Sequence, residues 1–157
     1  MSEPPVALTI AGSDSGGGSG LQADLRTFAA HSVHGVCAVT AVSAQNTEEF
    51  RSVLSIPKKE LEAQIEAVLH DFDVKATKTG LLLSEENIQL IAKMAEAGVL
   101  PQLVIDPVIV DRHGELLYHP DLVRGICQEL ISQALIITPN HLEAMHLLGV
   151  ELTDDID

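Results

Sequence analysis

Short apolar runs alternate along this chain with stretches whose apolar residues recur at helical spacing. We expect β-strands over residues 6–11, 35–43, 75–79, 102–106 and 134–138, all of them largely apolar except the segment 75–79. The periodic stretches predict helices over residues 20–31, 58–71, 85–97, 120–132 and 140–148. Pro57, Ser84 and Pro120 are expected helix starts, and Gly98 and Gly149 are expected stops. Strands and helices that alternate in this way predict an α/β fold, in which helices cover both faces of a mostly parallel sheet.

A glycine-rich segment joins the first predicted strand to the first predicted helix. It holds five glycines between Gly12 and Gly20, and glycine lets a backbone take positive φ and approach a ligand closely. The lysine of a Walker A loop is missing, and the dinucleotide pattern G-x-G-x-x-A at residues 18–23 begins too far beyond the strand. Polar residues along the loop argue against a plain flexible linker. We expect a loop that holds a small ligand, with N–H groups at the helix start directed to its polar atoms.

Polar or glycine-containing segments follow every predicted strand. In an open parallel sheet, ligands bind outside the carboxyl ends of the strands. The sequence therefore predicts one shared pocket, bordered by the glycine loop with Asp14, Gln45-Asn46, Gly80-Leu81, Asp106-Pro107-Val108, and Asn140 with Glu143.

Several of these side chains have both a functional and an ordinary structural explanation. The amide of Gln45 offers the donor and acceptor that an aminopyrimidine edge requires, but it could also serve a turn. Asp106 could act through water on Mg²⁺ or form a turn before proline. Asn140 and Glu143 lie one helical turn apart and could form a capping box. Asp24 could be a favourable charge in the first turn of a helix.

Charge and hydropathy narrow the classes of partner. The formal net charge is −14, from 23 acidic and 9 basic residues, which argues against nucleic acids and anionic membrane surfaces as partners. No apolar run approaches the roughly 20 residues of a membrane span, and the start of the chain does not resemble a signal peptide. The seven histidines show no zinc-binding spacing. We expect a cytoplasmic protein with no metal site of its own and with local devices for binding phosphate.

Five segments then carry motifs in a fixed order: LTIAGSDSGGGSGLQADL at 8–25, VTAVSAQNT at 39–47, KTGLL at 78–82, VIDPV at 104–108 and TPNHLE at 138–143. Together they resemble hydroxymethylpyrimidine/phosphomethylpyrimidine kinases, the thiamin-pathway branch of the ribokinase-like superfamily. The resemblance implies a three-layer α/β/α fold with a mostly parallel central sheet. Residues 1–157 would form the N-terminal portion of a single ribokinase-like kinase domain.

The resemblance also implies an activity and its cofactors. Such kinases use ATP and Mg²⁺ to phosphorylate 4-amino-5-hydroxymethyl-2-methylpyrimidine and then its monophosphate, and they are usually homodimers. Two alternatives stay open. One is a pyridoxal or pyridoxine kinase of the same superfamily, although the segment Gln45-Asn46-Thr47 favours the pyrimidine. The other is a truncated, non-catalytic pyrimidine-binding domain.

The resemblance assigns roles to particular residues. Those expected to bind the substrate are Gly12, Asp24, Gln45, Leu81 and Val108, with Gln45 reading the pyrimidine, Asp24 near its hydroxymethyl group, and Leu81 and Val108 as apolar walls. Those expected on the nucleotide and Mg²⁺ side are Asp106, Asn140 and Glu143.

The family's second glycine-rich segment has no counterpart in these 157 residues. In the family that segment forms the anion hole and supplies the residue proposed as the catalytic base. We therefore expect a fragment of a kinase or a truncated homologue that is inactive alone, and no catalytic base can be assigned within the sequence.

Overall fold

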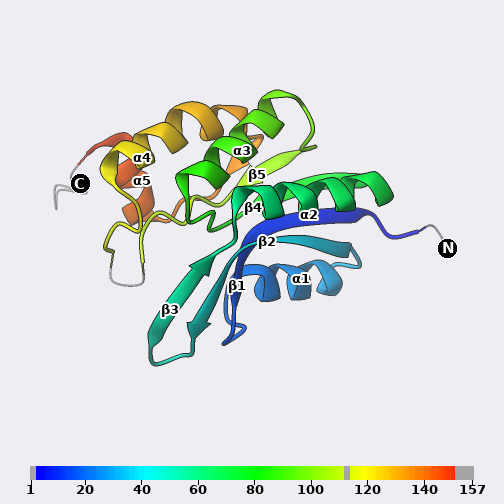
Figure 1. Cartoon of the computed structure of the whole chain (residues 1–157), viewed down its shortest axis with the longest axis horizontal. Coiled ribbons are helices and arrows are strands. Elements are labelled where there is room, and N and C mark those ends of the chain that lie inside the picture. The colour runs from blue at the N-terminus through cyan, green and yellow to red at the C-terminus, as the bar shows by residue number, and fades with distance from the viewer. Residues whose placement is uncertain (1–2, 112–113, 151–157) are drawn as a thin grey trace, which may run out of the picture.

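The computed structural model describes residues 3–111 and 114–150. Their strands form one six-stranded sheet in the order β3-β2-β1-β4-β5-β6. The strands are β1 (Val6–Asp14), β2 (His34–Gln45), β3 (Phe50–Ser55), β4 (Val74–Thr79), β5 (Leu103–Ile105) and β6 (Ile136–Ile137). The helices are α1 (Gly20–Ala30), α2 (Lys58–Asp71), α3 (Glu85–Glu96), α4 (Pro120–Gly125) and α5 (His141–Leu148). Helix α1 covers one face of the sheet while α2 and α3 cover the other (Figure 1). The predicted α/β layering with a mostly parallel sheet is therefore confirmed.

One strand was not expected from the sequence. Strand β3 pairs antiparallel with β2, whereas all other neighbours in the sheet are parallel. Asn46 closes the hairpin between them, because its side-chain oxygen accepts hydrogen bonds from the backbone N–H groups of Glu48 and Glu49. None of the β3 residues is fully buried, so the strand lacks the apolar run by which the buried strands were recognised.

The C-terminal part also differs from the sequence prediction. The single helix expected over residues 120–132 is instead α4, a π-helical turn at Ile126–Leu130 and a 3₁₀ turn at Ile131–Gln133. The strand expected over residues 134–138 pairs only through Ile136 and Ile137. Both residues of β6 are exposed. The strand therefore lacks the buried apolar side chains that hold the longer strand β1 against the core.

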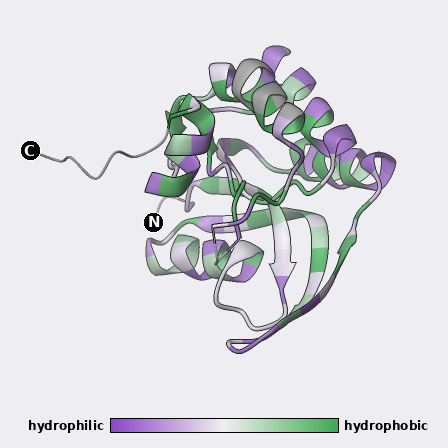
Figure 2. Cartoon of the chain, turned by 90° about the vertical axis from the view of Figure 1, so that its left-hand side faces the viewer, coloured by the Kyte–Doolittle hydropathy of each residue, from purple (hydrophilic) through white to green (hydrophobic). Residues whose placement is uncertain are grey.

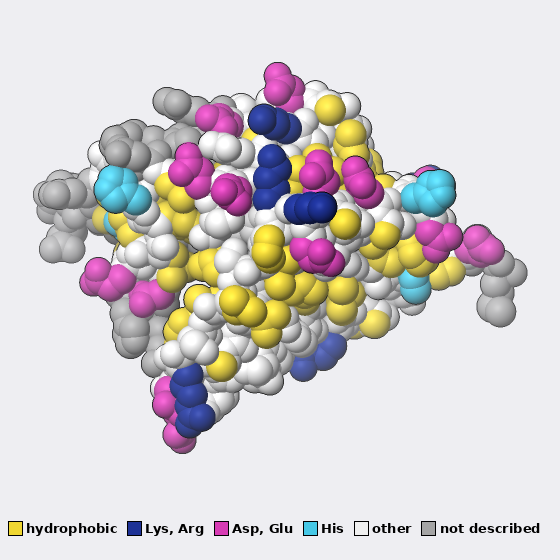
Figure 3. Space-filling view, viewed as in Figure 1, with side chains coloured by type: hydrophobic (Ala, Val, Ile, Leu, Met, Phe, Trp, Pro, Cys, Tyr) yellow, Lys and Arg dark blue, Asp and Glu magenta, His cyan; other side chains and the backbone are white. Residues whose placement is uncertain are grey.

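The main core lies between the sheet and helices α2 and α3. Its largest fully buried apolar side chains include Leu8, Ile10, Leu61, Ile65 and Ile91. Helix α3 begins as predicted, since the hydroxyl oxygen of Ser84 accepts a hydrogen bond from Asn87 N. The helices carry hydrophilic and hydrophobic residues together, as expected of helices that cover a sheet (Figure 2). Acidic and basic side chains are intermixed on the surface in Figure 3.

A buried carboxylate organises the glycine loop that connects β1 to α1. Asp14 Oδ1 accepts a hydrogen bond from Gly16 N at 2.7 Å. Its Oδ2 accepts from Gly18 N at 3.0 Å and from both the N–H and the hydroxyl of Ser19 at 2.9 Å. The expectation of ligand contacts from N–H groups at the start of the helix stays a prediction, but the loop N–H groups of Gly16, Gly18 and Ser19 do not contribute to them. An internal carboxylate already satisfies these N–H groups.

These contacts also determine the acidity of Asp14. Burial acts to raise the pKa of this carboxyl, but hydrogen bonds from Ser19, Gln45 and Gly16 outweigh it and lower the pKa from 3.8 to about 2. The carboxylate therefore stays ionised at neutral pH, where its negative charge strengthens each of the loop's hydrogen bonds.

We predict that Asp14→Asn destabilises the fold by on the order of 2 kcal/mol, because an amide nitrogen cannot accept the hydrogen bonds that Oδ2 receives. A carboxyl with a lowered pKa in the folded state stabilises it above the unfolded pKa, and this contribution is lost as pH falls toward about 2. Thermal unfolding between pH 2 and 6 measures both effects. Asp73→Asn is the matched control, because the side chain of Asp73 is 82% exposed. Equal acid sensitivity of wild type and Asp14→Asn between pH 2 and 4 would contradict this account.

Candidate functional site

The end of β1 lies directly against the start of α1 and the segment after β4. Gly20 has a φ of +57°, and a Cβ there would stand 2.3 Å from the carbonyl oxygen of Gly12, so only glycine fits. A Cβ on Gly12 would meet Leu81 Cδ2 at 3.5 Å. Thr40 holds the same segment, since its hydroxyl donates to the carbonyl of Leu81 at 2.5 Å. The structure therefore brings together the predicted substrate residues Gly12 and Leu81.

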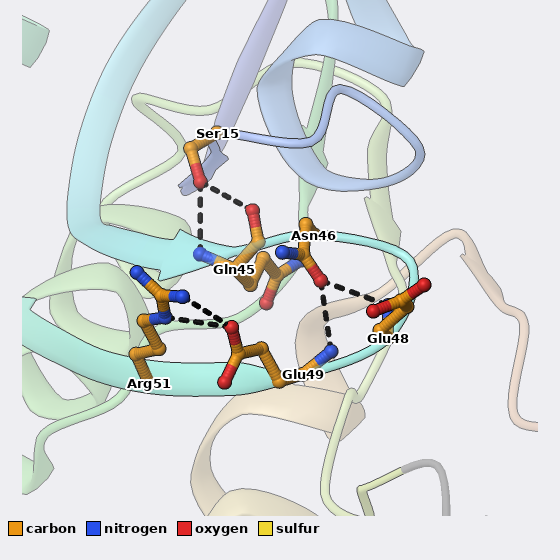
Figure 4. Close-up of polar contacts among 6 residues, drawn as sticks. All are labelled: Ser15, Gln45, Asn46, Glu48, Glu49 and Arg51. Atoms are coloured by element: carbon orange, nitrogen blue, oxygen red, sulfur yellow. Dashed lines mark hydrogen bonds and ion pairs between the residues drawn. The ribbon is translucent and has the colours of Figure 1, made fainter.

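Gln45 lies at the end of β2, where backbone contacts fix it to the glycine loop. Gln45 N donates to Ser15 Oγ at 2.8 Å, and Ser15 Oγ donates to the carbonyl of Gln45 at 2.6 Å (Figure 4). A hollow of about 170 Å³ opens beside these contacts and is lined by Ser15, Ala44, Gln45, Asn46, Glu49 and Arg51. The side chain of Gln45 also contributes a hydrogen bond that lowers the pKa of Asp14. Its amide is thus shared between the loop and the hollow.

A cluster of three charged side chains spans α1, β4 and the end of β5. Lys78 Nζ lies 3.2 Å from Asp24 Oδ2 and 3.5 Å from Asp106 Oδ2. Asp24 Oδ2 also accepts a hydrogen bond of 2.6 Å from the hydroxyl of Thr9. Burial raises the pKa of Asp106, the nearby Lys78 opposes that rise, and the charge of Asp24 adds to it.

Two features of this cluster were not expected from the sequence. Asp24 is the fifth residue of α1 and lies beyond its first turn, so the explanation of a charge in the first helical turn is wrong. Lys78 received no role, although the buried Thr77 and Thr79 flank it on β4. A lysine between two buried strand residues is the signal that could have identified it.

The segment after β5 is tied to the start of α5. Asn140 and Glu143 form the predicted capping box, in which Glu143 N donates to Asn140 Oδ1 at 3.0 Å and Asn140 N donates to Glu143 Oε2 at 2.9 Å. The other carboxylate oxygen of Glu143 accepts from Ile109 N at 3.1 Å. Glu143 is only 4% exposed. Its two oxygens therefore join helix α5 to the backbone beside Val108.

Val108 itself has an unusual backbone conformation. Its φ is +44°, in a region that β-branched residues rarely adopt and that surrounding structure must impose. Backbone strain of this kind is concentrated at functional sites. The adjacent contact from Ile109 to Glu143 supplies part of that constraint.

Contacts within the structure place the predicted residues in several groups. Gly12 and Leu81 are adjacent, Asp24 and Asp106 meet at Lys78, and a chain of hydrogen bonds connects Asn140, Glu143 and the residue after Val108. Gln45 lines the hollow at the β2–β3 hairpin. Asp106 lines a second hollow of about 10 Å³ beneath Gly80. Neither of these two hollows is lined by residues from all of the groups, and the single shared pocket stays a prediction.

Metal sites and membrane-spanning helices are two further features to consider in the described residues. Across residues 3–111 and 114–150, no set of three or more histidine, cysteine, aspartate or glutamate side chains is arranged to hold a metal ion. None of the helices in these ranges is long and apolar enough to cross a bilayer.

Relatives and solved structures match nearly the whole chain. A curated hydroxymethylpyrimidine/phosphomethylpyrimidine kinase of Synechococcus elongatus is 46% identical over 98% of this chain, and one of Haemophilus influenzae is 44% identical over 99%. The chain spans only 58% of the length of either relative. A crystal structure of phosphomethylpyrimidine kinase from Clostridium difficile superposes with a TM-score of 0.87 at 40% identity, covering 96% of this chain and 65% of that one.

A second group of solved structures consists of pyridoxal kinases. The ADP complex of Bacillus subtilis pyridoxal kinase superposes with a TM-score of 0.85 at 35% identity, covering 98% of this chain and 57% of that one. With these neighbours, the expected ribokinase-like fold is confirmed. The family model described as phosphomethylpyrimidine kinase matches residues 14–157. The chain therefore belongs to the phosphomethylpyrimidine kinase family.

Proposed function

We propose that residues 1–157 form the N-terminal portion of a kinase domain that phosphorylates 4-amino-5-hydroxymethyl-2-methylpyrimidine and then its monophosphate. The related kinases of Synechococcus elongatus and Haemophilus influenzae, which are named for this activity, support the proposal. The observation that carries the substrate assignment is the position of Gln45, whose backbone is fixed by Ser15 while its amide borders a hollow. A side-chain amide at this position can donate to a ring nitrogen and accept from the exocyclic amine beside it.

The remaining substrate contacts come from residues beside the glycine loop. The flat ring lies between the apolar side chains of Leu81 and Val108, close to the backbone of Gly12. Asp24 accepts a hydrogen bond from the hydroxymethyl group. Support comes from the adjacency of Gly12 and Leu81 and from the imposed backbone conformation of Val108.

The nucleotide is ATP, bound on the side of Asp106 and α5. Solved neighbours support this choice, because Staphylococcus aureus pyridoxal kinase has been crystallised with ADP and with AMP-PCP. The side chain of Asp106 is 34% exposed and can reach Mg²⁺ through water. Glu143 fits a supporting role, because backbone N–H groups already engage both of its oxygens. Bound Mg²⁺ would neutralise charge on the phosphates, and Asn140 and Glu143 would position the segment that faces them.

We also propose a cytoplasmic homodimer, in keeping with the family expectation. The reaction asks the protein mainly to align the acceptor hydroxyl with the phosphate and to stabilise charge. The residues described here supply the acceptor side of that alignment. The anion hole and the catalytic base belong to the part of the family's length that this sequence does not span.

Pyridoxal is the second candidate substrate. Pyridoxal kinases superpose almost as well as the pyrimidine kinase, and one from Staphylococcus aureus has been solved with pyridoxal bound. A steady-state assay of ATP consumption separates the two candidates. It requires a complete kinase that carries this sequence as its N-terminal part. We expect a higher kcat/KM for the pyrimidine alcohol, and a higher value for pyridoxal would reverse the assignment.

We predict that Gln45→Leu, in that complete kinase, weakens pyrimidine binding by about 1–3 kcal/mol because the substrate's polar edge loses its partner. The affinity for ATP should remain nearly unchanged. Gln89→Leu is the matched control, since Gln89 is exposed on α3 and bonds only Glu85 among the side chains described. An unaltered KM for the pyrimidine in Gln45→Leu would remove this residue from the substrate site.

We predict that Glu143→Gln lowers turnover and raises the Mg²⁺ concentration required for half-maximal rate. An amide can accept only one of the two backbone hydrogen bonds, so a stability loss on the order of 1 kcal/mol should accompany the kinetic effect. Glu86→Gln on the exposed surface of α3 is the control. Melting temperature and Mg²⁺ titrations of the rate are measured together. A lower melting temperature with normal kinetics would leave Glu143 as a helix cap only.

A further inference from the structure

We propose that Lys78 is a positioning residue that holds the substrate-side carboxylate of Asp24 and the nucleotide-side carboxylate of Asp106 in register across the sheet. This inference rests on the proposed function, because it is that function which gives the two carboxylates their roles. Lys78 itself contacts neither substrate in this account. It acts through the two aspartates.

Lys78 lies on a central strand of the sheet. Strand β4 lies between β1 and β5, and Lys78 pairs with Thr9 on one side and Val104 on the other. Thr9 is fully buried and donates to the same Asp24 oxygen that Lys78 contacts. The side chain of Lys78 is 24% exposed and that of Asp24 is 13% exposed. The cluster is thus partly shielded from water, where ion pairs are screened less than at the surface.

The backbone leaves room for the ammonium group. A Cβ on Gly80 would stand 3.5 Å from Lys78 Nζ and 3.0 Å from Ala11 Cβ. The distance to Nζ is an ordinary van der Waals contact, so the ammonium group lies beside Gly80 at the carboxyl end of β4. There Lys78 Nζ lies within 3.5 Å of an oxygen from each aspartate.

An ammonium group solves the electrostatic problem created by two neighbouring carboxylates. Burial raises the pKa of Asp106, the charge of Asp24 raises it further, and Lys78 opposes both effects. Without the lysine, repulsion would favour protonation of Asp106 or separation of the two side chains. Either change would alter the distance between the acceptor side and the nucleotide side of the site.

The geometry also leaves an oxygen for the substrate. Within the described residues, the hydrogen bonds from Thr9 and Lys78 both fall on Asp24 Oδ2. Oδ1 remains to accept a hydrogen bond from the substrate's hydroxymethyl group. Because Lys78 and Thr9 approach Oδ2 from adjacent strands, they fix the orientation of the whole carboxylate.

The test compares Lys78→Met, which removes the charge, with Lys78→Arg, which keeps it. Lys75→Met is the matched control, because Lys75 lies on the same strand and its ion pair with Asp73 is exposed. The first readout is the carbon-13 chemical shift of the Asp106 carboxyl, titrated by NMR in the 157-residue chain. Among the described residues, the charged groups that act on Asp106 are Lys78 from β4 and Asp24 from α1. We expect its titration midpoint to rise in Lys78→Met, because the opposing positive charge is lost, and to stay unchanged in Lys75→Met.

The second readout is the kinetics of the complete kinase. Lys78→Met should lower kcat/KM for the pyrimidine at least about tenfold, with a raised pyrimidine KM, while Lys78→Arg recovers most of the loss. Melting temperatures identify a variant that has merely unfolded, in which case Lys78→Arg and Lys75→Met carry the comparison.

Both results are required. An unchanged Asp106 titration, or a kcat/KM within twofold of wild type in folded Lys78→Met, overturns the proposal. A wild-type kinase with no pyrimidine turnover would instead refute the proposed function. The NMR titration would then still decide whether Lys78 couples the two carboxylates.

Discussion

The carboxylate of Asp14 is the interaction on which the rest of this site depends. It gathers the N–H groups of Gly16, Gly18 and Ser19, and thereby determines where the glycine loop ends and helix α1 begins. A loop with so much glycine has many conformations to lose on folding, and hydrogen bonds to a charged acceptor offset that entropic cost. Asp24 lies on helix α1, so its position depends on where this loop places the start of the helix.

From that fixed start, each polar group is positioned by another segment of the chain. The backbone of Gln45 is bound to Ser15 of the loop, and Glu143 of α5 holds the backbone next to Val108. Lys78 connects α1 to the end of β5 through its two aspartates. Side chains from one segment thus hold the backbone or the charge of another, an arrangement that preorganises the acceptor side of a phosphoryl transfer.

Much of the fold follows from the sequence because burial produces regular patterns. The apolar run of β1 and the periodic spacing in α2 and α3 indicated the sheet and its covering helices. Strand β3 was not predicted because its residues are exposed or only partly buried. The segment 120–132 was predicted as one helix because periodicity cannot distinguish α from π or 3₁₀ turns.

Within the site, the capping box of Asn140 and Glu143 was legible from residue types at fixed spacing. The contact of Glu143 with Ile109 joins positions 34 residues apart, and the pairing of Lys78 with Asp24 spans 54. Contacts at such separations depend on strand order, which local patterns do not encode. The hydrogen bonds from the loop N–H groups to Asp14 were not predicted either. The sequence alone does not say whether a carboxylate of the chain or a ligand accepts them.

The most direct test of this substrate site is a crystal structure of the complete kinase with the pyrimidine alcohol bound. We expect the ring between Leu81 and Val108, with the Gln45 amide in hydrogen-bond contact with the aminopyrimidine edge and the hydroxymethyl oxygen beside Asp24. A ring bound elsewhere, with Gln45 still directed only to Asp14, would contradict this placement.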